Sequence, residues 1–268
     1  MQKRIGHLAV VFVALAVGLP AQVQPQPGRE ASSIRVPFVG CKSDGLAGPK
    51  PAPVKAWPWE TVWVDAKTAK SLAYYKAEMS LGVLAPRGWY CFGTYGTNGS
   101  NLFVAPQPVK RDDLFSARSH SFTGPFIQVT FSYGGTSGRF SVARTIARVF
   151  PSRKAFVQHV IDEGIEPASD FPFGPFPKDK PVFQSDQIVE YQTPPHSEGL
   201  GTMSWLEPDG DPVESVAILT GSWPDMVHLA VRLPAGLRDL TPHIVRQVEG
   251  DYADKNTDHQ AGGQRQEK

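Results

Sequence analysis

The chain has 268 residues and carries 27 Lys and Arg against 26 Asp and Glu, a formal net charge of +1. A near-neutral chain lacks the bulk electrostatic attraction that draws proteins to nucleic acids and anionic membranes, so we expect no nucleic-acid partner. Hydrophobic residues make up 41% and charged residues 20%, which is typical of a globular protein rather than a disordered one.

The chain begins with the pattern of a secretory signal peptide, predicted over residues 1–21. Two basic residues precede an uncharged apolar run over residues 8–19, and the small residue Ala21 follows it. The run is shorter than the about 20 apolar residues that cross a bilayer, so we expect no permanent membrane span after cleavage. A cut after Gly18 is the alternative. Export places the mature protein in the periplasm or outside the cell.

A Gln- and Pro-rich flexible leader is predicted over residues 22–33, and a first strand over residues 34–41. The chain has two cysteines, Cys41 and Cys91. Because exported proteins meet an oxidising compartment, we expect the two to form a disulfide. The alternative is a catalytic cysteine with a separate histidine.

The next segment is predicted to be a helix over residues 66–81. Asp65 is a good N-cap, and Leu72, Tyr75 and Met79 recur at helical spacing. Gly82 supplies the expected stop.

Two patterns in the middle of the chain predict β-structure. Asn98-Gly99, after the aromatic and Gly-rich segment 88–95 and before the apolar residues 102–104, is typical of a hairpin turn. Residues 126–133 alternate apolar and polar side chains and predict a strand.

The sequence Gly134-Gly135-Thr136-Ser137-Gly138 stands between that strand and a helix predicted over residues 139–150. It lacks the Lys-Ser/Thr pair of a phosphate-binding P-loop and the spacing of a dinucleotide site, so we interpret it as a tight turn. The helix carries three basic residues that are weak candidates for an anion site: Arg139, Arg144 and Arg148. A second helix is predicted from Ser152 to Gly164.

The last third predicts a long loop followed by an antiparallel meander. Prolines and phenylalanines interleave over residues 166–181, which indicates a packed loop or, alternatively, a mobile cover over a groove. The predicted strands cover residues 187–193, 202–206, 213–220 and 226–233. A final helix ends at Val248, and residues 249–268 are predicted to be a disordered tail.

Catalytic candidates are few. His120, His196 and His228 are weak candidates for acid–base chemistry beside a carboxylate. Asp209 and Asp211 are a pair that can hold a cation, but no third ligand can be assigned, and the metal-ligand spacings of zinc sites are absent from the sequence. We therefore expect no metal and no cofactor.

Binding candidates include the aromatic residues Trp89 and Tyr95. If the predicted strands are right, a set of polar side chains lies on outward faces of the sheet, as in an ordinary half-solvated sheet or in a ligand-binding surface. The set is Gln128, Thr130, Ser132, Glu190, Gln192, Thr202, Ser204, Glu214, His228 and Arg232.

Three segments carry a resemblance to known sequences: Val36-Pro37-Phe38-Val39-Gly40-Cys41-Lys42-Ser43-Asp44-Gly45, Gly82-Val83-Leu84-Ala85-Pro86-Arg87-Gly88-Trp89-Tyr90-Cys91-Phe92-Gly93-Thr94-Tyr95-Gly96 and Gly199-Leu200-Gly201-Thr202. They resemble blocks of a family of exported bacterial proteins with no assigned function. The resemblance implies a bacterial periplasmic or secreted protein and supports both cysteines, but it implies no activity.

We predict an α+β fold in a single domain over residues 34–248. It has a mixed or mainly antiparallel sheet, helices packed on one face, and one disulfide near the N-terminus. The predicted function is non-catalytic binding of a ligand or an envelope partner by an exported protein. The alternatives are a hydrolase acting on cell-envelope material and a structural or assembly protein.

Overall fold

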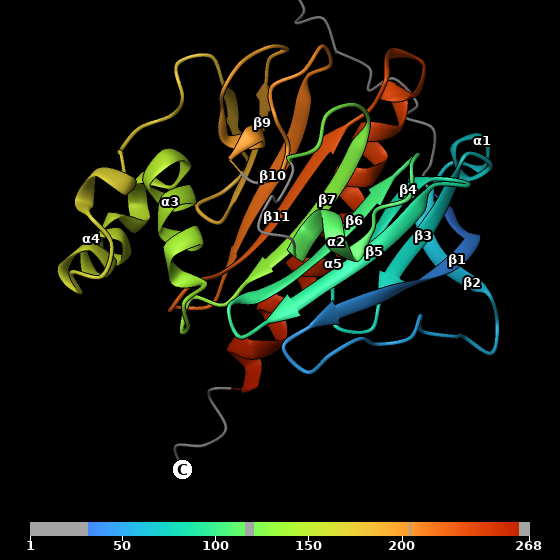
Figure 1. Ribbon diagram of the computed structural model, residues 1–268, viewed down its shortest axis with the longest axis horizontal. Helices are drawn as coiled ribbons and strands as arrows, with labels where there is room; N and C mark the ends of the chain where they lie inside the picture. Colours follow the sequence, from blue (N-terminus) through green and yellow to red (C-terminus); the bar gives the residue numbers. More distant parts are fainter. Residues whose placement is uncertain (1–31, 116–120, 204, 263–268) are drawn as a thin grey trace, which may run out of the picture. The chain divides into compact units, whose positions relative to one another are not determined.

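The strands of the protein join in one large mixed sheet (Figure 1). The computed structural model describes residues 32–115, 121–203 and 205–262, and the signal peptide predicted over residues 1–21 lies outside them. The strands are β1 (Ser32–Gly45), β2 (Trp59–Val64), β3 (Leu72–Ala77), β4 (Gly82–Pro86), β5 (Tyr90–Gly96), β6 (Gly99–Ala105), β7 (Phe126–Ser132), β8 (Lys180–Phe183), β9 (Ile188–Thr193), β10 (Val213–Thr220) and β11 (Asp225–Arg232). The helices are α1 (Ala66–Ala69), α2 (Arg111–Phe115), α3 (Arg139–Val149), α4 (Lys154–Asp162) and α5 (Thr241–Gly262).

Strand β1 connects the two parts of the sheet. It pairs antiparallel with β2, then parallel with β3, and finally parallel with β5. From β5 the order continues β6-β7-β11-β10-β9-β8, and every pair in this run is antiparallel. The α+β class and the mixed sheet are confirmed.

The helices cover both faces of the sheet, so the prediction that they pack on one face is wrong. Consecutive residues of a strand point to opposite faces. In β11, Val227 belongs to the core under α5, where Ile244 is buried, while Met226 belongs to the core with α3. Figure 1 shows α5 behind the sheet, α2 in front of it and α3 beside β11. We name these the α5 face and the α3 face.

The expected disulfide between Cys41 and Cys91 is confirmed, but its predicted place near the N-terminus is wrong. It joins β1 to β5, with 5.4 Å between the Cα atoms, and Cys41 is buried in the core of the sheet. The bridge therefore fixes β1 to β5, the first strand of the antiparallel run, at the point where β1 changes its strand partner.

The helix predicted over residues 66–81 is also wrong. Asp65 caps a helix as expected, with its carboxylate accepting from the N–H groups of Lys67 and Thr68, but α1 ends at Ala69. The chain then forms β3 and β4, because β3 is flanked by pairing partners on both sides. Ala73, Tyr75 and Ala77 are buried at the two-residue spacing of a strand.

Three further segments differ from the sequence prediction. The described residues of the range 202–206 form no strand. A 3₁₀ turn, Leu200–Thr202, reaches the start of that range, and Ser204 lies outside the described residues. The final helix passes Val248 and continues to Gly262, and Tyr252 packs in the core. Part of the predicted tail is thus helical. Ser32 and Ser33, assigned to the leader, begin β1.

The hairpin at Asn98-Gly99 and the strand at residues 126–133 are confirmed as β5–β6 and β7. The loop over residues 166–181 packs against α3: Phe171 is buried, and the Arg148 guanidinium lies 3.9 Å from the Phe176 ring centre. Among the described residues, no helix is both long enough and apolar enough to span a bilayer.

A buried arginine holds two loops to the end of β11. Arg232 is fully buried and donates hydrogen bonds to the backbone carbonyls of Phe122, Gly124 and Glu207. These carbonyls come from the segments before β7 and after Trp205. The guanidinium is suited to this contact because it offers five donors in a fixed plane.

We expect replacement of both cysteines by alanine to lower the free energy of unfolding by about 4 kcal/mol, because the bridge closes a loop with a sequence separation of 50. Urea unfolding measures it. Reduced wild-type protein should match the double variant, and an unchanged unfolding midpoint would contradict the expectation.

Arg232→Met should lower the free energy of unfolding by about 3 kcal/mol or more, because it leaves three carbonyls without their donor. The matched control is Arg238→Met, since Arg238 is exposed and paired with Asp211 at the surface. Surface pairs contribute about 1 kcal/mol at most. Equal losses in the two variants would show that Arg232 is not a structural clamp.

Candidate functional site

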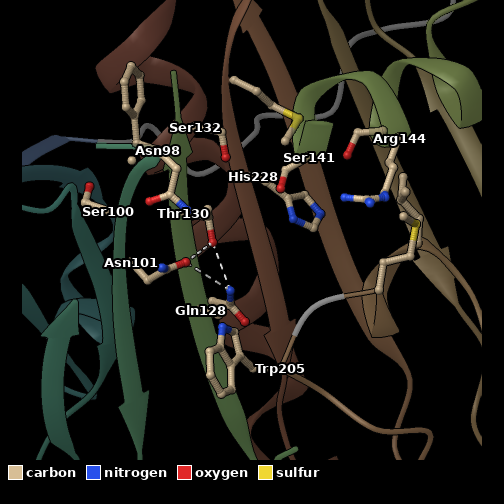
Figure 2. A pocket seen from close by; sticks show the side chains of 16 residues that line it. Asn98, Ser100, Asn101, Gln128, Thr130, Ser132, Ser141, Arg144, Trp205 and His228 are labelled. Atoms are coloured by element: carbon tan, nitrogen blue, oxygen red, sulfur yellow. Dashed lines mark hydrogen bonds between the residues drawn. The ribbon is translucent and has the colours of Figure 1, made fainter. Parts of the chain in front are cut away.

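A cavity of about 360 Å³ opens on the α3 face of the sheet, between β6, β7, β11 and α3 (Figure 2). Most of the side chains that line it carry hydroxyl or amide groups. The lining is Asn98, Gly99, Ser100, Asn101, Gln128, Thr130, Phe131, Ser132, Ser141, Arg144, Thr145, Leu200, Met203, Trp205, Met226 and His228.

The register of the sheet builds the cavity floor. Thr130 of β7 lies opposite Asn101 of β6 on one side and opposite His228 of β11 on the other. Residues directly opposite one another share a face and bring their Cβ atoms to about 5 Å. Three strands therefore contribute one row of polar side chains. The alternate residues Val129 and Leu229 belong to the core under α5.

Hydrogen bonds fix the orientation of the floor side chains. The Thr130 hydroxyl donates to Asn101 Oδ1 at 2.7 Å, and Gln128 Nε2 donates to Thr130 Oγ1 at 2.9 Å. Asn101 Nδ2 donates in turn to Thr94 Oγ1 at 3.1 Å. Figure 2 shows Asn101, Thr130 and Gln128 side by side on the floor. A ligand therefore meets side chains that are already ordered, which reduces the entropy that binding costs.

His228 is the β11 member of the row, and it is buried and neutral at neutral pH. Burial lowers its pKa to about 4. Its Nε2 atom is hydrogen-bonded to the hydroxyl of Tyr191, whose pKa is raised by burial, and the two rings stack with 5.9 Å between their centres.

Arg144 of α3 brings a positive charge to the cavity wall, and carboxylates compensate it. Its Nη2 atom lies 2.6 Å from Glu166 Oε2 and 3.9 Å from Asp170 Oδ2. Its guanidinium also lies over the ring of Phe171, at 5.6 Å from the centre. None of the described residues that line the cavity is Asp or Glu.

An aromatic cluster supports one end of the cavity. Trp205 packs edge-on against Phe103 with 5.8 Å between ring centres, and Phe122 stacks on Phe126 at 4.3 Å. Figure 2 shows Trp205 below Gln128 at this end. The indole is thus held from behind by other rings while one part of it lines the cavity.

Of the residues singled out from the sequence as candidate sites, Arg144 and His228 line the cavity. His196 is exposed in a turn with a positive φ of 52°, and its N–H donates to the Asp209 carbonyl at 2.8 Å. His120 lies outside the described residues. The three histidines are therefore not shown to share a site.

The other candidates have structural contacts. Arg139 pairs with Glu163, and Arg148 donates to the Gly174 carbonyl. The Trp89 N–H donates to the Tyr75 hydroxyl, and the Tyr95 hydroxyl donates to the Gly48 carbonyl. Within the described part of the chain, these residues do not line the cavity.

The Asp209 and Asp211 carboxylates are occupied by groups of the protein. Asp209 accepts from the N–H groups of Gly124 and Gly210, which hold its pKa below the usual range, and Asp211 pairs with Arg238. Over the ranges that the structure describes, there is no cluster of three or more His, Cys, Asp or Glu side chains suited to a metal ion.

The polar strand residues do not form a single outward surface. Gln128, Thr130, Ser132 and His228 line the cavity on the α3 face. Glu214 lies opposite Val231 on one side and Gln192 on the other. Because Val231 belongs to the core under α5, Glu214 and Gln192 lie on the α5 face. The sequence prediction did not include Asn101, Ser141 or Trp205, because their proximity depends on pairing between distant strands and on a helix and loop that cross the sheet.

The sequence motif Gly134-Gly135-Thr136-Ser137-Gly138 forms a closely packed turn. A Cβ atom on Gly138 would lie 2.3 Å from the Asn98 carbonyl oxygen, and the Gly134 N–H donates to Asp225. These contacts agree with a tight turn.

No protein-family description, characterised protein or solved structure matches the chain. The function of the cavity is therefore inferred from the residues that line it.

The low pKa of His228 should make stability fall in acid. The unfolded histidine titrates near pH 6.5 and the folded one near pH 4, so the contribution is complete above pH 6.5 and is lost between pH 6.5 and 4. The loss is on the order of 3 kcal/mol at pH 4. Glu249 acts in the opposite direction, because burial and Glu190 raise its pKa to about 7 and its ionisation opposes folding above about pH 4.5.

The measurement is therefore made on Glu249→Gln, which removes the opposing contribution of Glu249. Because His228 becomes protonated on unfolding in acid, the free energy of unfolding of this variant should fall by about 3 kcal/mol between pH 7 and pH 4. The double variant Glu249→Gln/His228→Gln should lack this part of the pH dependence. Parallel pH profiles for the two proteins would contradict the burial of a neutral imidazole.

Proposed function

We propose that the protein is an exported binding protein that holds a small polar ligand in the cavity on the α3 face, without catalysing its conversion. The observation that carries the proposal is the ordered row Asn101, Thr130 and His228, set into a cavity between two apolar clusters. A concave site with a few convergent polar groups and hydrophobic walls is typical of small-molecule binding.

Export is part of the proposal and has three supports. The sequence over residues 1–21 has the order of a signal peptide. The Cys41–Cys91 disulfide is compatible with an oxidising compartment such as the periplasm or the medium. The resemblance of three segments to exported bacterial proteins supports the same location.

The second candidate function is a hydrolase acting on cell-envelope material. Its support is that a serine, Ser141, and a histidine, His228, line the same cavity. Against it, the hydrogen-bond partner of His228 is Tyr191 rather than a carboxylate, and a pKa of about 4 makes the imidazole a weak base at neutral pH. Turnover of ester, peptide or peptidoglycan substrates that is abolished by His228→Gln would favour the hydrolase.

Filling the cavity should abolish binding. Ser141 lies on α3 with an exposed side chain, so Ser141→Phe places a ring in the cavity without disturbing a core. The wild-type protein, incubated with the low-molecular-weight fraction of a bacterial envelope extract, should retain a compound detectable by native mass spectrometry. Ser141→Phe should retain at most a tenth as much.

Ser152→Phe is the matched control, because Ser152 is also exposed and does not line the cavity. It should behave as wild type. Equal retention by all three proteins, or none by any, would contradict a binding function of this cavity.

A further inference from the structure

We propose that the ligand of this cavity is an uncharged, polyhydroxylated molecule: a monosaccharide, a small disaccharide or a sugar alcohol. The inference rests on the proposed binding function and specifies its ligand class. Charge balance, hydrogen-bonding capacity, the apolar wall and the size of the cavity each support it.

The charge balance of the wall selects against ions. Arg144 is paired with Glu166 and faces Asp170, and His228 is a neutral imidazole. An anionic ligand would therefore meet no uncompensated cation among the described lining residues, and a cationic ligand would meet no carboxylate. Burying an unpaired charge costs several kcal/mol, so a neutral ligand is favoured.

The polar side chains match hydroxyl groups. The hydroxyls of Ser132, Ser141 and Thr145 both donate and accept, as do the amides of Asn98 and Gln128. A sugar hydroxyl also donates and accepts, so it can extend the chain of hydrogen bonds that already runs from Gln128 through Thr130 to Asn101. A purely apolar ligand would exclude water from this part of the wall without offering hydrogen bonds in return.

The wall also offers apolar surface for the C–H groups of a sugar ring. Trp205, Leu200 and Met226 lie among the polar side chains that line the cavity. Trp205 is fixed by Phe103 behind it, so its indole presents a rigid surface with one polar N–H. A pyranose ring has this same combination of apolar faces and a polar rim.

The size agrees with one or two sugar rings. The cavity volume of about 360 Å³ equals the volume that roughly a dozen water molecules occupy in the liquid. Cavities that bind small ligands have volumes from about 300 Å³ upward. A larger oligosaccharide would have to extend into solvent.

Isothermal titration calorimetry with size-matched sugars tests the ligand class. The panel comprises uncharged hexoses, N-acetylhexosamines, disaccharides and sugar alcohols, each set beside its uronic or aldonic acid and its amino sugar. We expect at least one uncharged member to bind, and its acidic and basic analogues to bind at least tenfold more weakly.

Thr130→Val removes the central hydroxyl of the floor and should weaken that binding at least tenfold, because partner groups are left unsatisfied. The matched control Thr61→Val alters an exposed strand threonine of β2 and should leave affinity unchanged. Urea unfolding of both variants establishes that they are folded. If Thr130→Val is unstable, Gln128→Leu replaces it in the same comparison.

Tighter binding of a charged analogue overturns the uncharged class but leaves the binding function intact. So does the absence of any sugar or polyol binding while Ser141→Phe still abolishes retention of an extract compound. If Ser141→Phe reduces the retention of no extract compound relative to the wild-type protein, the binding function itself is overturned.

Discussion

The constraint on which the structure depends is that β7 and β11 are covered along the whole α5 face and at both ends of the α3 face. Every second residue of these strands must fit the core under α5, as Val129 and Leu229 do. The intervening residues face α3 and the aromatic cluster, and these cover the strands at their two ends. Between the two clusters the same face carries Thr130 and His228. The cavity is thus the uncovered middle of an otherwise buried sheet face, and the rigidity of the sheet fixes its shape.

The chemistry of this cavity follows from how its charges are neutralised. His228 lies too deep to be protonated at neutral pH and is held by Tyr191, while Arg144 is held by Glu166. What remains to meet a ligand is a set of hydroxyl and amide groups in fixed orientations. Such groups give specificity by the penalty for leaving them unpaired, not by strong attraction, so the account favours selective binding of a neutral molecule over proton transfer.

Much of the fold could be predicted from local sequence patterns. The errors lie in segments whose structure depends on pairing with strands far away in the sequence. The alternation in β7, β10 and β11 and the Asn98-Gly99 turn were predictable because each depends on neighbouring residues. The Cys41–Cys91 bridge was predictable from the export that the sequence predicts. Leu72 and Tyr75 fit a helical spacing equally well, and pairing of β3 with β1 and β4 decides for a strand. The polar residues of β7 and β11 were recognised, but which of the strand residues share a face depends on register. Asn101 and Trp205 join them only through contacts between segments far apart in the sequence.

The most direct test of this account is a crystal structure of the protein grown with the tightest-binding uncharged sugar. We expect density for a sugar ring over the row Asn101, Thr130 and His228. Its hydroxyls should lie within hydrogen-bond distance of the Thr130 and Gln128 side chains, and an apolar face of the ring should lie toward Trp205. Density for the sugar on another surface, with this cavity filled by water alone, would contradict it.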